Sequence, residues 1–199
     1  NEKIETTLFD SGLVDIQWRP KVAEGMVDTA LTAKSLALFD VREDALRVVC
    51  QARLEFGRAF RDTFSFSAPA DYLVEQVVGD NVRGWTAKPA ADRQRIDVTL
   101  LKPAQGSETL TLHLAKRGRV GEGELAEFDA PSILVEGAAL EQGEIAVRRS
   151  PRLDLRSLGA VGLSRADSGE QTQALEQAAD AADAAVLLVK PFQNYRFVK

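Results

Sequence analysis

Cysteine and histidine are almost missing from this chain of 199 residues, with Cys50 the only cysteine and His113 the only histidine. Cys50 therefore has no partner for an internal disulfide. A site that needs two imidazoles, such as the HExxH zinc helix, cannot form within the chain either. We predict no metal site and no cofactor.

Long apolar runs and an excess of basic charge are also missing. Apolar stretches such as Ala184 to Val189 fall far short of the roughly 20 residues that cross a bilayer, so we expect no membrane insertion. Lys and Arg number 25 against 30 Asp and Glu, which argues against nucleic acid as a partner. The 45% of hydrophobic residues is ample for a folded core.

Alternation of apolar and polar residues dominates the first two thirds of the chain and predicts half-buried strands. Two long strands, Thr29 to Phe39 and Ala45 to Phe56, are expected to form a hairpin through Asp40 to Asp44. The apolar face of the second strand should consist of Leu46, Val48, Cys50, Ala52, Leu54 and Phe56. Further strands at about ten-residue spacing are typical of a sandwich or barrel.

The expected fold is mainly β, an antiparallel β-sandwich with one short C-terminal helix. A first short strand carries Val14, Ile16 and Trp18, and the sandwich spans residues 1–118. Residues 119–199 follow the glycine-rich connection from Arg117 to Gly123. They should pack on the first part or form a small adjoining sheet. Their expected short strands are Ile133 to Val135, Ile145 to Val147, Leu153 to Leu155, Ala185 to Val189 and Tyr195 to Val198.

The helix is expected at about residues 168–183. Ser168 and Gln171 have the spacing of a capping box, and Leu175, Ala178 and Ala182 form a thin apolar stripe.

None of the familiar catalytic patterns is complete. Gly162 to Ala166 approaches the nucleophile elbow G-x-S-x-G around Ser164, but Ala166 replaces the last glycine, so a structural turn is the better interpretation. Cys50 lies on an apolar strand face and should be a buried small hydrophobe. His113, between Leu112 and Leu114, is interpreted as a solvated strand histidine. We predict no catalytic residue.

Other chemistry-bearing residues have similar structural explanations. Gly118, Gly121 and Gly123 lack the G-x-G-x-x-G spacing, and Asp180 with Asp183 lacks EF-hand spacing. The aromatic residues Trp18, Trp85, Tyr72 and Tyr195 could offer a platform for sugar or peptide, but the two tryptophans follow the alternation of core positions. Carboxylate pairs suited to a glycosidase are not excluded by composition. No ligand-binding residue is assigned.

The stretch from Phe64 to Leu114 resembles a module of very large, multi-domain bacterial cell-envelope proteins. The similar features are Phe64-Ser65-Phe66 before Pro69, Val77-Val78, and Gly79-Asp80-Asn81-Val82-Arg83-Gly84-Trp85; Gly143-Glu144-Ile145-Ala146-Val147 extends the resemblance. It implies an extracytoplasmic β-sandwich in the periplasm or cell envelope, without assigned chemistry.

We therefore expect a non-catalytic structural or interaction module of a larger envelope-associated protein. Its partners would be neighbouring domains of the same longer chain, since the chain starts without Met and stops within strand-like sequence. The alternatives are a carbohydrate- or peptide-binding sandwich with a glycan or protein ligand, and a carboxylate-dependent glycosidase.

Overall fold

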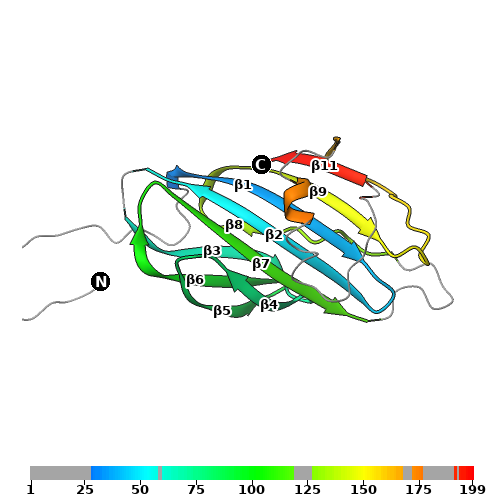
Figure 1. Cartoon of the computed structure of the whole chain (residues 1–199), viewed down its shortest axis with the longest axis horizontal. Coiled ribbons are helices and arrows are strands. Elements are labelled where there is room, and N and C mark those ends of the chain that lie inside the picture. The colour runs from blue at the N-terminus through cyan, green and yellow to red at the C-terminus, as the bar shows by residue number, and fades with distance from the viewer. Residues whose placement is uncertain (1–27, 58–59, 119–126, 168–171, 177–190, 192) are drawn as a thin grey trace, which may run out of the picture.

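The strands form two hydrogen-bonded sheets in the computed structural model (Figure 1). The structure describes residues 28–57, 60–118, 127–167, 172–176, 191 and 193–199, with a turn of helix at 172–176. The strands in these residues are β1 (Asp28–Val41), β2 (Ala45–Glu55), β3 (Arg61–Pro69), β4 (Leu73–Val78), β5 (Val82–Ala90), β6 (Arg93–Ala104), β7 (Ser107–Arg117), β8 (Leu134–Val135), β9 (Ala138–Arg149), β10 (Ser164–Arg165) and β11 (Gln193–Val198). The mainly β sandwich with a short helix is confirmed.

Sheet A contains seven of the described strands in the order β10-β11-β9-β1-β2-β7-β4, and sheet B contains four in the order β5-β6-β3-β8. Paired strands run antiparallel, except that β1 and β9 run parallel. The sequence pattern did not indicate this parallel pair. It requires a long connection, which the chain supplies by passing through both sheets before β9 returns beside β1.

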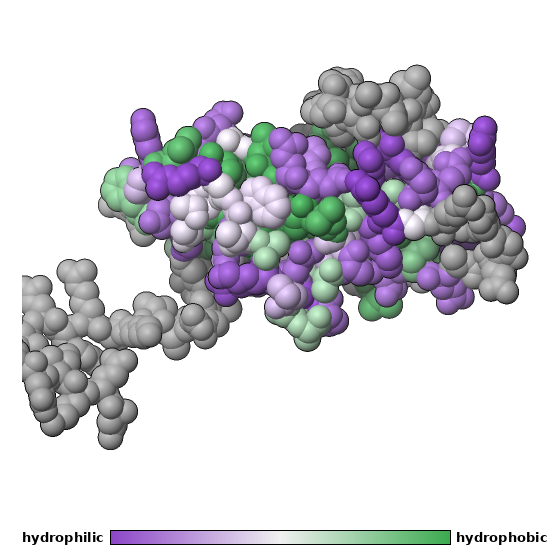
Figure 2. All heavy atoms as spheres, turned by 90° about the horizontal axis from the view of Figure 1, so that it is seen from below, coloured by the Kyte–Doolittle hydropathy of each residue, from purple (hydrophilic) through white to green (hydrophobic). Residues whose placement is uncertain are grey.

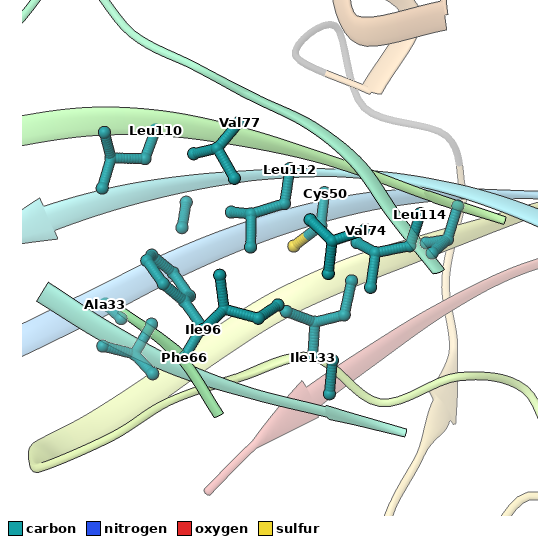
Figure 3. Close-up of a cluster of buried hydrophobic side chains, with 14 of the residues drawn as sticks. Ala33, Cys50, Phe66, Val74, Val77, Ile96, Leu110, Leu112, Leu114 and Ile133 are labelled. Atoms are coloured by element: carbon teal, nitrogen blue, oxygen red, sulfur yellow. The ribbon is translucent and has the colours of Figure 1, made fainter. Parts of the chain in front are cut away.

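The predicted hairpin of β1 and β2 is confirmed, with pairing from Thr32 opposite Glu55 to Val41 opposite Leu46. At its turn the backbone N–H of Arg42 donates to the carbonyl of Ala45 at 2.9 Å. The predicted apolar face of β2 is buried throughout and packs in the main core. Figure 3 shows Cys50 of β2 pointing into this core beside Leu112, together with Phe66 and Ile96 of sheet B.

The chain changes sheet at the turn Gly79 to Asn81. β4 pairs with β7 in sheet A, whereas β5 pairs with β6 in sheet B. Glycine suits this position because a Cβ on Gly79 would lie 3.0 Å from both Leu110 Cδ2 and the Thr109 carbonyl oxygen, which is a tight contact. A side chain at this position would therefore require small shifts of β7 or Leu110.

Strands after residue 118 extend both sheets. β8 pairs with β3 in sheet B, while β9 lies between β1 and β11 in sheet A. β9 is longer than the predicted Ile145 to Val147. Its Gly143 permits close approach to β1, since a Cβ there would lie 2.2 Å from the Ser35 carbonyl oxygen and 2.9 Å from the Phe197 ring.

The strand predicted at Leu153 to Leu155 is wrong. These residues adopt no strand pairing, although Leu153 and Leu155 pack against the core. Their backbone is held by a turn instead, in which the Leu153 N–H donates to the Ser150 carbonyl at 3.1 Å. Alternation of apolar residues indicates which side chains are buried. A strand also needs a neighbouring strand with which it can form hydrogen bonds.

Several expectations fall outside the described residues. These are the strand with Val14, Ile16 and Trp18, the glycines Gly121 and Gly123, the strand Ala185 to Val189, and the helix outside 172–176 with Ala178, Asp180, Ala182 and Asp183.

Candidate functional site

A groove of about 620 Å³ lies on the outer face of sheet A, beside the helix at 172–176. Residues of β1, β2, β7, β9 and β11 line it, and Ala174 and Leu175 come from the helix. In Figure 1 the helix (orange) crosses this face at β1 and β9. Leu175 anchors it there by packing on Leu38 and Ala146 in a second, smaller apolar cluster.

Strand register arranges the side chains at the groove in two cross-strand rows. The first row consists of Thr109, Arg53, Lys34, Gln142 and Val198. The second row consists of Gln51, Leu36, Glu144 and Arg196. Neighbouring members of a row are separated by about one strand spacing, roughly 4.8 Å.

Two cations face each other in the first row. Lys34 of β1 lies directly opposite Arg53 of β2, an arrangement that destabilises a sheet. The two share one carboxylate, with Glu55 Oε1 3.7 Å from Lys34 Nζ and 3.4 Å from Arg53 Nε. Their side chains are 58% and 64% exposed, so most of their donor capacity faces solvent.

The carboxylate of the second row is already engaged. Glu144 accepts a hydrogen bond from Thr172 Oγ1 at 2.9 Å and one from Arg196 Nε at 2.7 Å. Both of its oxygens are used, one for the helix and one for β11. Glu144 therefore fastens the helix to the sheet.

Three polar side chains around the cations have no partner among the described residues. Gln51, Gln142 and Thr109 form no side-chain hydrogen bond within the described part of the chain. Their amide and hydroxyl groups, together with Lys34 and Arg53, make the groove rich in donors. Leu36 and the exposed Val198 add aliphatic surface beside them.

The outer face of sheet B differs, because its charged side chains bond to one another and to neighbouring serines. Asp97 accepts from Ser65 Oγ at 2.8 Å and from Arg95 Nε at 2.7 Å, and Arg93 Nε donates to Ser67 Oγ at 2.6 Å. The hydrogen bond from Arg95 contributes most to lowering the pKa of Asp97; burial opposes it, and the hydrogen bond from Ser65 lowers the pKa further. The charged side chains of this face therefore have partners on the face itself.

Glu141 is a buried carboxyl in the sandwich interior. It accepts from Ser35 Oγ at 2.9 Å and from the Val135 N–H at 3.0 Å, and so joins β9 to β1 and to β8 of the other sheet. Burial raises its pKa, although both hydrogen bonds oppose the shift. The role that these contacts indicate is structural.

A second buried polar cluster joins β1 to β9. Arg148 donates through Nε and Nη2 to the two oxygens of Asp40, at 2.7 and 2.8 Å, and Arg42 Nη2 lies 3.5 Å from Asp40. The Arg148 side chain is 3% exposed. This bidentate pair fixes the parallel register.

The residues considered for nucleophilic chemistry lie far apart. Ser164 is exposed on β10 after Gly162, whose φ of 72° marks a turn, and His113 is on β7. Four strands separate β10 from β7 in sheet A, so roughly 24 Å lies between the two strands. Ser164 and His113 cannot form a catalytic pair.

His113 lies on the polar side of β7 as predicted, but it is half-buried rather than solvated. Burial lowers its pKa, and the charge of Glu75 partly opposes this. Cys50 is buried and free, as predicted, and burial, aided by the charge of Glu141, raises the pKa of its thiol to about 12.

The aromatic residues do not gather into an exposed platform within the described residues. Trp85 is partly buried against the core, and Tyr72 and Tyr195 are buried in it. Trp18 falls outside the described residues. The exposed large apolar side chains include Phe60, Leu73 and Leu101, which come from different segments of the chain. Figure 2 shows apolar surface (green) interleaved with polar surface (purple) on the side seen there.

Sequence reasoning missed the groove. The alternation of β2 already placed Arg47, Gln51, Arg53 and Glu55 on a polar face, which was the one signal available. That Lys34 and Gln142 lie beside Arg53 depends on pairing between distant strands.

No group of three or more His, Cys, Asp or Glu suited to a metal ion occurs among the described residues. The same residues contain no helix that is long and apolar enough to span a bilayer.

Comparison with known proteins defines no family, since neither a family model nor a curated protein matches the chain. Among solved structures it is similar to an M1 zinc metallopeptidase from Deinococcus radiodurans, with 14% identity, a TM-score of 0.40, and coverage of 87% of this chain and 39% of that one. A non-cellulosomal cohesin from Archaeoglobus fulgidus matches at 9% identity with a TM-score of 0.34, covering 60% of this chain and 92% of that one. The chain thus spans well under half of the metallopeptidase, and likenesses at these TM-scores transfer no activity.

Proposed function

We propose that the chain is a non-catalytic interaction module of a larger, envelope-associated protein, and that it engages another molecule in the groove on sheet A. The observation that carries this proposal is the contrast between the two outer faces. The charged side chains Arg93, Arg95 and Asp97 of sheet B have partners on their own face, whereas Gln51, Gln142 and Thr109 in the groove have no partner in the described chain. Unused hydrogen-bonding groups in a concave surface are typical of binding sites.

The envelope setting rests on the sequence resemblance around Gly79 to Trp85. Cell fractionation of the parent protein tests it, with recovery in the periplasm or envelope expected and recovery in the cytosol contradicting it. Neighbouring modules of the same chain would then flank the sandwich.

The residues of the groove favour binding over hydrolysis. A glycosidase needs two carboxylates facing one cleft, about 5–9.5 Å apart. Of the described residues that line the groove, Glu144 alone carries a carboxylate, and both its oxygens are engaged.

A pair of matched substitutions tests the groove. Thr109→Trp fills it from β7, and Thr99→Trp places the same side chain on the outer face of sheet B, where Thr99 is also exposed. On peptide and glycan arrays we expect probes bound by the wild-type chain to be kept by Thr99→Trp and lost by Thr109→Trp. If both variants kept the same probes, the binding site would lie outside the groove.

A further inference from the structure

We propose that the groove binds an acidic peptide, whose carboxylates lie against Lys34 and Arg53 and whose aliphatic side chains contact Leu36 and Val198. This inference rests on the proposed function and names its ligand class.

Charge comes first. Lys34 and Arg53 lie opposite each other on adjacent strands and share the single carboxylate of Glu55. The first row therefore carries an uncompensated positive charge at the groove, together with a repulsion that costs stability. A ligand carboxylate between the two cations would relieve that repulsion and gain charge-assisted hydrogen bonds.

Hydrogen bonding extends the same row. Thr109 flanks Arg53 on one side and Gln142 flanks Lys34 on the other, so four hydrogen-bonding side chains follow one another across four strands. Their span is roughly 14 Å at one strand spacing per step. Amide side chains can both donate to and accept from a peptide backbone, which suits Gln142 and, one row away, Gln51.

The apolar part of the lining favours a peptide over an acidic polysaccharide. Sugars are commonly recognised by stacking on exposed aromatic rings, and no Trp or Tyr occurs among the described lining residues. The ring of Phe197 fills the space where a Gly143 Cβ would lie. Aliphatic Leu36 and Val198 remain, and they match Leu or Val side chains of an amphipathic acidic segment.

The test uses the full chain and three probes: a labelled peptide of alternating Glu and Leu, the same peptide with Gln for Glu, and an oligogalacturonate. Binding is followed by fluorescence anisotropy at low salt and at physiological ionic strength. We expect the Glu peptide to bind more tightly than the Gln peptide, with an affinity that falls as salt rises.

Two double variants separate a site from general charge. Lys34→Gln with Arg53→Gln should weaken binding of the Glu peptide by about tenfold or more. Lys88→Gln with Arg156→Gln removes the same charge from side chains that are 71% and 82% exposed and do not line the groove, so it should change binding less than about twofold. Circular dichroism checks folding, and Thr109→Trp, which keeps both cations, is the second blocking variant.

Equal binding of the Gln peptide, equal losses in both double variants, or no binding of the Glu peptide would each overturn the inference. So would groove-dependent binding of the oligogalacturonate without the peptide. A neutral array ligand that Thr109→Trp abolishes would sink this inference and leave the proposed function standing.

Discussion

The outer faces of the two sheets are built from similar alternating strands, yet they use their polar residues differently. On sheet B, Asp97 accepts hydrogen bonds from both Ser65 and Arg95, so these polar groups stabilise the face itself. On sheet A, Lys34 and Arg53 oppose each other around one carboxylate. A polar strand face is therefore structural or available for binding according to what lies across from each residue.

The largest expected effect concerns the division of the chain. If sheet A is one unit, a protease cut between Arg117 and Glu124 should leave both pieces associated and unfolding in a single transition, because β9 pairs directly with β1. Denaturant unfolding of the cut chain checks this. Release of two separately stable fragments would contradict it.

Next in size is loss of the buried ion pair. Asp40→Ala should lower the free energy of unfolding by about 3–5 kcal/mol, because a buried Arg148 guanidinium loses its bidentate carboxylate. Asp97→Asn on sheet B, where the side chain is 29% exposed, should cost no more than about 1 kcal/mol. Similar losses in the two variants, measured in urea, would show that the buried Asp40–Arg148 pair stabilises the protein no more than the partly exposed contacts of Asp97.

Glycines give a smaller and sterically defined difference. Gly143→Ala should destabilise by about 1–3 kcal/mol, since its Cβ would meet backbone at 2.2 Å. Gly84→Ala in β5 has open space around the new methyl and should be neutral or slightly stabilising. Thermal unfolding of both variants measures this difference. If Gly143→Ala were as stable as the wild-type chain, β1 and β9 would be less closely apposed.

The smallest effects are opposite pH dependences. Burial raises the folded pKa of Glu141 above 4.5, so its contribution to stability is present below pH 4.5 and is lost as pH rises through the folded pKa. The hydrogen bonds from the Val135 N–H and Ser35 and the charge of Lys199 lower this pKa, but burial outweighs them. Glu141→Gln should flatten this decline.

Asp97 should show the reverse. Its folded pKa lies below 3.8, so its contribution is present above pH 3.8 and is lost as pH falls through the folded value. Unfolding free energies of Glu141→Gln and Asp97→Asn, measured across the acid range, give both slopes. If the contributions of Glu141 and Asp97 changed with pH in the same direction, the environment of one of these two carboxyl groups would be misassigned.

Local pattern was sufficient wherever a strand pairs with its sequence neighbour. The alternation of Leu46, Val48 and Cys50 identified the buried face of β2, and a short polar turn identified the hairpin with β1. It failed where burial depends on distant partners. Leu140 is 42% exposed while Glu141 is 4% exposed, the reverse of their hydropathy, because Ser35 and Val135 supply the hydrogen bonds that a buried carboxyl needs.

The amino-acid sequence by itself determined that this chain is a β protein with a large apolar core, because period-two alternation is a property of each strand alone. Tertiary structure decided which strands became neighbours. It set β9 parallel to β1, moved the chain to sheet B at Gly79, and placed Lys34 opposite Arg53. The groove exists only through that register, since a slip of one residue would turn its cations toward the core.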